Sequence, residues 1–215
     1  MASVASVVSE DGTAGAAATS QREPETKGER TRRRLLEIAI ERFGERGYRA
    51  TSVSEIARAA GLTQAAAYAY FPSKEALFDA AVDADASALI SEAESRLAGT
   101  PVRQLVPMLL VLFLGGLDRH PLVRRVLSGQ EPEALARLVD LPVLGRLTGD
   151  IADAVRTGQG RGEVRADLDA DLFASGAETI VLSLLMSVSQ VGSSTEARRQ
   201  LGVLTIFDAV LRPPT

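Results

Sequence analysis

The side chains able to do covalent or metal chemistry are few in this sequence. It contains no Cys and a single His, His120. Thiol nucleophiles, Cys-ligated zinc, iron–sulfur clusters and His-rich metal centres are therefore excluded, and we expect no metal and no cofactor. An all-helical enzyme would have to rely on carboxylates, yet no paired acidic motif lies within a strongly apolar helical segment. The sequence accordingly does not indicate an enzyme.

Basic and hydroxyl side chains gather in one segment instead. Residues 27–77 hold ten Lys or Arg and six Asp or Glu, a net charge of +4, whereas the whole chain carries −4. Ser52, Thr63 and Ser73 each stand at the expected start of a helix, where free backbone N–H groups can hold phosphate oxygens. This block favours a local anionic partner, although a solvated helix face would carry the same charge.

Helical periodicity positions these residues. Apolar residues repeat at helical spacing between Arg30 and Phe43, and Gly47 suits the left-handed conformation that follows a helix. Ser52 and Glu55 fit a capping box. The predicted helices of this segment are 30–47, 53–60, 64–70 and 73–97.

The two short helices flank a turn at Gly61, whose missing side chain permits a positive φ. Behind a longer first helix, this pair predicts a helix-turn-helix. In such a unit the second short helix enters a major groove about 12 Å wide and presents side chains to base edges. The segment therefore predicts a DNA-binding domain.

About fifty residues of this segment resemble, without a gap, the DNA-binding domain of the TetR family of bacterial regulators. A weaker likeness, centred on the turn 158–165, extends over residues 30–215. The matching residues are Ile38-Ala39, Phe43, Gly47-Tyr48, Thr51-Ser52-Val53, Ile56-Ala57, Ala60-Gly61-Leu62-Thr63, Tyr68, Tyr70-Phe71-Pro72-Ser73-Lys74-Glu75 and Leu77.

The resemblance implies a role for individual residues. Thr51 and Ser52 would contact phosphate by hydroxyl and backbone N–H, Tyr68 and Tyr70 would lie against the DNA backbone, and Lys74 would bind a phosphate. A second group would face the groove, where an amide can bond adenine and a methyl can meet thymine. This group comprises Thr63, Gln64, Ala65 and Ala69.

The sequence also departs from the family pattern. Alanines occupy positions 65–67, and the third helix has no Lys or Arg before Lys74. We therefore expect modest base readout, with more of the affinity coming from phosphates and groove shape. Arg49, just before the second helix, could compensate.

The remaining chain shows no strand alternation, so the predicted fold is all-α. We expect a disordered tail (1–26), the helix-turn-helix domain (27–77) and a helical effector-binding and dimerisation domain (78–215). The resemblance implies a ligand cavity and a homodimer built by the last two helices. Apolar stripes there are Ile180, Leu184, Val191, Leu201, Leu204 and Leu211. Candidate pocket residues are Met108, Leu112, Phe113 and Met186.

The resulting hypothesis is a ligand-responsive transcriptional regulator, with a repressor favoured over an activator. It binds a palindromic operator in double-stranded DNA, and a small hydrophobic or amphipathic effector releases it. A helix bundle that binds proteins and has lost DNA recognition stays open as an alternative, because the third helix is rich in alanine. We expect a cytoplasmic protein with no membrane partner. The longest apolar run, 105–114, is too short to span a bilayer, and the N-terminal residues do not resemble a secretory signal.

Overall fold

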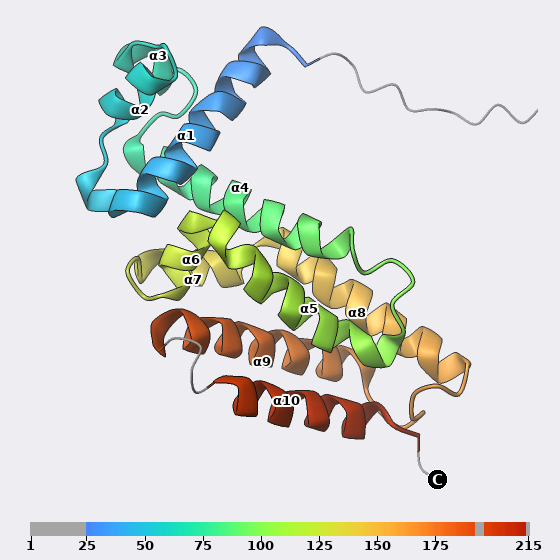
Figure 1. Cartoon of the computed structure of the whole chain (residues 1–215). Coiled ribbons are helices and arrows are strands. Elements are labelled where there is room, and N and C mark those ends of the chain that lie inside the picture. Colours follow the sequence, from blue (N-terminus) through green and yellow to red (C-terminus); the bar gives the residue numbers. More distant parts are fainter. Residues whose placement is uncertain (1–24, 192–195, 214–215) are drawn as a thin grey trace, which may run out of the picture.

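The computed structural model describes residues 25–191 and 196–213, and within these ranges it contains helices and no strand (Figure 1). Most of the predicted tail, residues 1–24, lies outside them. The elements are α1 Lys27–Ala50, α2 Val53–Ala59, α3 Gln64–Tyr68, α4 Lys74–Glu94, α5 Val102–Gly116, the 3-10 helix η1 Leu117–Arg119, α6 Pro121–Leu127, α7 Glu133–Val139, α8 Pro142–Gly160, α9 Ala170–Val191 and α10 Glu196–Leu211.

Residues 27–77 form what we call the head, and residues 78–213 form the body. Figure 1 shows α1, α2 and α3 together at one end, while α4 starts in the head and runs into the body. Apolar burial links the two parts, because Leu35 and Phe43 of α1 and Leu77 of α4 are almost fully buried in one continuous core. A rotation of the head must therefore move the start of α4.

Local signals fix where the head's helices begin. The Thr26 side chain accepts a hydrogen bond from Glu29 N–H and completes a capping box for α1. Ser52 and Glu55 form the predicted capping box of α2, with Glu55 N–H 3.2 Å from Ser52 Oγ. Thr63 and Ser73 cap α3 and α4 through the N–H groups three residues on. Each cap satisfies a backbone donor that the helix leaves unpaired.

The predicted turn at 158–162 is shorter than expected. Helix α8 continues through Gly160, and the left-handed residue is Gly162, with φ of 72°. Gly158 lies inside the helix, where an added Cβ would come within 2.8 Å of Val164 and 2.9 Å of Val102. This glycine therefore permits close packing of α8 and does not end it.

Helix α9 has an apolar surface that the protomer leaves largely uncovered. Among the described helices it alone is long and apolar enough to cross a membrane, and 22% of that stretch is buried; α5 with η1 and α6 would qualify only as a pair bent by 111°. The helix itself was predicted, but its membrane-like length of apolar sequence was not, because Ser, Thr and Gly interrupt its apolar residues. An apolar face of this size needs a covering surface.

Candidate nucleic-acid interface and internal cavities

The turn between α2 and α3 has the geometry that its sequence predicts. Gly61 has φ of 76°, and Leu62 N–H donates to the Ala57 carbonyl at 2.8 Å. On the inner side, Ile56 and Ala67 are buried, so α2 and α3 pack on α1 through small apolar contacts. The outer side of α3 is left open to solvent.

The predicted groove-facing residues lie together on that outer side. Thr63, Gln64, Ala65 and Ala69 are exposed, and Tyr68 is 39% exposed. The Gln64 amide nitrogen lies 3.5 Å from the Tyr68 hydroxyl, one helical turn away. The exposed side of α3 therefore presents one amide and one phenol next to the methyl groups of two alanines.

Lys74 and Tyr70 flank this surface, and both also serve the fold. The Lys74 ammonium lies 4.5 Å from the centre of the Tyr48 ring and 3.5 Å from the Arg49 carbonyl oxygen. These contacts hold the cation between α1 and α4 and leave it donors for a further acceptor. Tyr70 is half-buried against the core.

Thr51 has a different role from the predicted phosphate contact. It is 2% exposed, and its hydroxyl donates within α1, 2.9 Å from the Gly47 carbonyl and 3.1 Å from that of Arg42. A hydroxyl buried in this way cannot reach a phosphate outside the head. Ser52 is half-buried, and its hydroxyl is 3.1 Å from Ser54 Oγ.

The basic side chains of the head differ in how far carboxylates neutralise them. Arg46 lies 3.7 Å from Glu55, and Arg42 lies 3.3 Å from Glu45. Arg49 and Arg58 are exposed and have no carboxylate within ion-pair distance among the residues described. Arg58 was not among the predicted DNA contacts, although its place next to the turn of the helix-turn-helix could have indicated it.

A loop of the body fastens the bend of α1. The Glu131 carboxylate accepts Tyr48 N–H at 3.0 Å and Arg125 Nε–H at 2.9 Å. At the bend, Gly47 has φ of 83°, and an added Cβ would lie 2.5 Å from the Arg125 guanidinium and 2.6 Å from Glu131. Gly47 is therefore required both by backbone conformation and by this contact.

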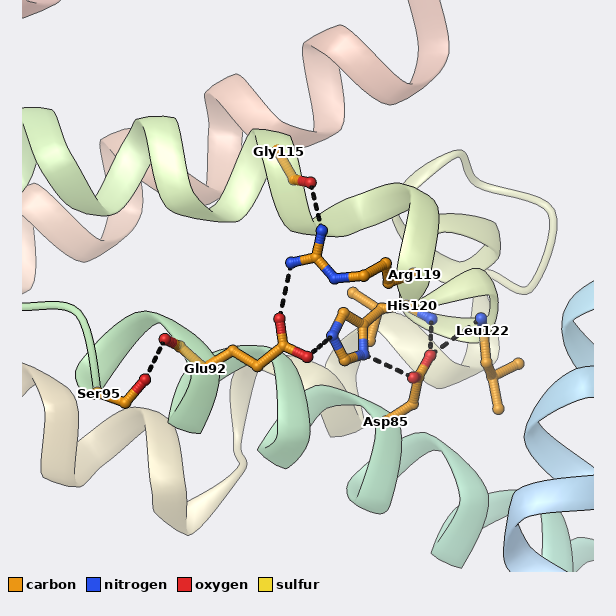
Figure 2. A network of polar contacts seen from close by, with 8 residues as sticks. Asp85, Glu92, Ser95, Gly115, Arg119, His120 and Leu122 are labelled. Carbon is orange, nitrogen blue, oxygen red and sulfur yellow. Dashed lines mark hydrogen bonds and ion pairs between the residues drawn. The ribbon is translucent and has the colours of Figure 1, made fainter.

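A second connection joins α4 to the start of α6 (Figure 2). Asp85, 3% exposed, accepts the N–H groups of Leu122 and Val123 at 3.0 Å each. Its other oxygen lies 2.8 Å from His120 Nδ1. The single His of the sequence is thus a buried partner of a capping carboxylate.

The same network reaches the surface through Glu92. His120 Nε2 lies 3.5 Å from Glu92 Oε1, an ion-pair distance without hydrogen-bond geometry. The Arg119 guanidinium donates to Glu92 at 2.7 Å, and this hydrogen bond is the main reason that the pKa of Glu92 lies below its ordinary value. Two helices and η1 therefore meet in one set of polar contacts (Figure 2).

The body contains a small, partly open apolar cavity, here called the inner cavity, between α5, α8 and α9. Its volume is about 60 Å³, room for a few water molecules. Two polar side chains, Thr148 and Glu178, interrupt its wall. The lining residues are Val106, Leu109, Phe113, Leu144, Leu147, Thr148, Ile151, Ala177, Glu178, Val181, Leu182 and Leu185.

Of the four predicted pocket residues, only Phe113 lines this cavity. Met108 is 38% exposed, and Leu112 and Met186 pack elsewhere in the core. The reason is helical phase: Leu109 and Phe113 share one face of α5, whereas Met108 and Leu112 point to a neighbouring face. The sequence analysis also missed Glu178, whose position in an apolar helix was the available signal.

The predicted stripes of the last two helices are corrected at two positions, whereas Val191 and Leu201 are exposed as predicted. Leu184 and Leu211 are 8% and 0% exposed and pack inside the protomer, where Phe207 of α10 also meets Phe173 of α9 edge to face at 5.8 Å. The large exposed apolar residues of these helices are Leu172, Val191, Leu201 and Ile206.

Known proteins resemble both the head and the whole fold. Residues 35–81 match the model of the bacterial regulatory proteins of the tetR family. The HTH-type transcriptional regulator YdgC of Bacillus subtilis is 39% identical over 106 residues, 49% of this chain and 47% of YdgC. The match thus spans about half of that relative's length.

Solved structures extend the likeness to the body. A TetR-family regulator from Rhodococcus sp. superposes with a TM-score of 0.66 at 22% identity, covering 84% of this chain and 98% of that one. The structure of AibR in complex with isovaleryl coenzyme A and operator DNA has a TM-score of 0.56 at 20% identity, covering 83% and 98%. These relatives are regulators and not enzymes. Residues 35–81 of the head therefore match the DNA-binding domain of the tetR family of bacterial regulatory proteins, and the body shares the helical fold of solved TetR-family structures.

Proposed function

We propose that this chain is a ligand-responsive transcriptional regulator, acting as a repressor in the cytoplasm. It binds a palindromic operator as a homodimer and leaves the operator when a small molecule occupies the body. The observation that carries the proposal is the capped α2–α3 unit with its solvent-facing surface. AibR, which shares the fold, was solved with both an effector-sized ligand and operator DNA.

In this proposal α3 enters the major groove. Gln64 meets a base edge, Ala65 and Ala69 contact methyl groups, and Thr63 approaches from the start of the helix. Phosphates are held at the edges of the groove by Tyr68, Tyr70, Ser52 and Lys74, and Arg49 and Arg58 add exposed cations that pair with no described carboxylate. Thr51 is left out because its hydroxyl is buried.

A single head of this size reads few bases, so two copies are needed. The exposed apolar residues of α9 and α10, among them Leu172 and Ile206, offer the face through which a second copy would bind. Gly176 and Gly202 add no side chain there and have open space around them. Two such faces can approach closely and form a bundle of four helices.

Effector release follows from how the cavity connects to the head. Phe113 lines the inner cavity near the end of α5, which continues through η1 to His120 and Pro121. Pro121 packs on α1, because a Cβ at Gly44 would lie 2.7 Å from it. A ligand that displaces Phe113 would thus shift α6 and, with it, the head. It favours dimers whose heads no longer match the operator spacing.

The test is binding of the full-length protein to DNA from its own promoter region, followed by selection from a random DNA pool. We expect salt-sensitive binding to a palindrome. Lys74→Ala should weaken binding to all sequences and make the dependence of affinity on salt shallower, by about 0.9 in the log–log slope for each phosphate that Lys74 neutralises. Gln64→Ala should instead relax preference at one position of each half-site. Arg146→Ala, which removes an exposed cation of α8, serves as the control.

Absence of DNA binding by the wild-type protein at low salt would overturn the proposal. Equal binding by the wild type and by variants of Tyr68 and Lys74 would favour the alternative, a bundle that binds proteins.

A further inference from the structure

The inner cavity has a neighbour. A more open cavity of about 160 Å³, here called the outer cavity, lies between the end of α4, α5 and α8. Leu109, Leu147 and Ile151 line both cavities, so one layer of side chains separates them. Rotamer changes in that layer would join the two into one channel.

Every ionisable side chain that lines this pair of cavities is an acid. Glu178 lines the inner cavity, and Glu94 and Asp150 line the outer one. No Lys, Arg or His belongs to either wall as the described residues form it. The walls of the two cavities are therefore mostly apolar, and their only charged side chains among the described residues are negative.

Glu178 is the acid placed deepest. It is half-buried, and the Thr148 hydroxyl lies 2.5 Å from its Oε2. Within the described part of the chain, no basic side chain stands within ion-pair distance of this carboxylate. A carboxylate in an apolar wall is costly unless a cation or several donors compensate it.

We propose that the effector is a cationic amphiphile, with a protonated amine or quaternary ammonium at Glu178 and an apolar body along α5 and α8. This inference rests on the proposed function and names the ligand class of the same cavity. An anionic ligand would find three like charges and no donor cation in the walls. AibR, by contrast, was solved with isovaleryl coenzyme A.

The small volume of the inner cavity adds a structural consequence. An alkyl chain does not fit into about 60 Å³, so binding must displace the layer of Leu109, Leu147 and Ile151. Helices α5 and α8 then separate, which moves Phe113 and the path to the head. The charge of Glu178 thus selects the ligand, and the length of the ligand's alkyl chain separates α5 from α8.

The test compares octylammonium, 1-octanol and octanoate, which share one chain and differ in charge. Calorimetric titration of the full-length protein should give affinity for octylammonium about tenfold or more above that for the other two, the range of a charge-assisted hydrogen bond. Glu178→Gln keeps the shape and the acceptor for Thr148 but should abolish this preference. Glu178→Asp should retain it, as should Glu163→Gln, which removes an exposed acid that lines neither cavity.

Equal or tighter binding of octanol or octanoate would overturn the inference, as would a Glu178→Gln variant with unchanged preference or a failure of all three probes to bind. Fluorescence anisotropy with labelled promoter DNA on the same preparations separates the two proposals. Loss of DNA binding with the amine preference intact contradicts only the proposed function. DNA binding without the preference contradicts only the ligand class.

Discussion

Replacing Asp85 by Ala removes the carboxylate that joins α4 to α6. Asp85 accepts two backbone N–H groups at 3.0 Å and pairs with His120 at 2.8 Å, all with almost no solvent exposure. The variant leaves two N–H groups and an imidazole nitrogen without acceptor in a closed space.

The expected loss can be worked from these contacts. A hydrogen bond to a charged acceptor contributes about 1.5–3 kcal/mol, and breaking a buried pair costs about 3–5 kcal/mol in total. We therefore expect Asp85→Ala to lower the free energy of unfolding by about 4 kcal/mol. Asp85→Asn keeps a capping oxygen and should lose about half of that. Asp83→Ala, two residues along α4, breaks an exposed ion pair with Arg137 and should cost less than about 1 kcal/mol.

The assay is urea unfolding followed by circular dichroism at pH 7 and one fixed protein concentration, since the proposed dimerisation would make stability depend on concentration. For a chain of this size, about 4 kcal/mol corresponds to a fall in Tm of roughly 8–16 °C. A loss for Asp85→Ala no larger than that for Asp83→Ala would refute the reasoning. So would equal losses for Asp85→Ala and Asp85→Asn, because capping would then contribute nothing.

Three further predictions concern separate regions. Gly47→Ala should destabilise more than Gly61→Ala in urea unfolding, because both have positive φ but only Gly47 faces side chains at 2.5–2.6 Å; equal losses would contradict the contact. The pKa of Glu92 is lowered, so the ionised carboxylate stabilises the fold when the pH is above the ordinary pKa of Glu, and this stabilisation is lost as the pH falls through the folded-state pKa. The wild type should therefore lose more stability than Glu92→Gln between about pH 5 and pH 3. Parallel pH curves for the two proteins would exclude the Arg119 contact as the cause. Ile206→Glu should convert the proposed dimer into monomers in sedimentation velocity, and a dimer that is unchanged in this variant would contradict an interface at α10.

Local signals in the sequence predicted much of the head. The capping box of Ser52 and Glu55 and the left-handed conformation of Gly47 and Gly61 depend on residues a few positions apart. Such features are fixed by backbone geometry, which is the same in any fold. The exposed face of α3 was predictable too, because helical spacing places Ala67 inside and Gln64 outside.

Side-chain contacts that depend on residues distant in the sequence could not be predicted. The Thr51 hydroxyl could equally have pointed outward, and only the bend of α1 shows that it binds two carbonyls there. The phase of α5 decided which side chains reach the inner cavity, and an apolar stretch without polar positions carries no information on phase. Glu178 could not be placed at the cavity either, because its hydrogen-bond partner Thr148 lies 30 residues away in the sequence.

The alanines of α3 have a consequence for how this head could acquire new targets. Ala65 and Ala69 are exposed and short, so either position can accept a longer side chain without disturbing the packing of Ala67 beneath. In the proposed complex, an Arg or Asn introduced there would gain a base contact of about 1–3 kcal/mol without changing the proposed phosphate contacts. Retargeting would thus take one codon change and leave the fold intact, which makes a sparsely decorated reading helix a convenient starting point for divergence among duplicated regulators.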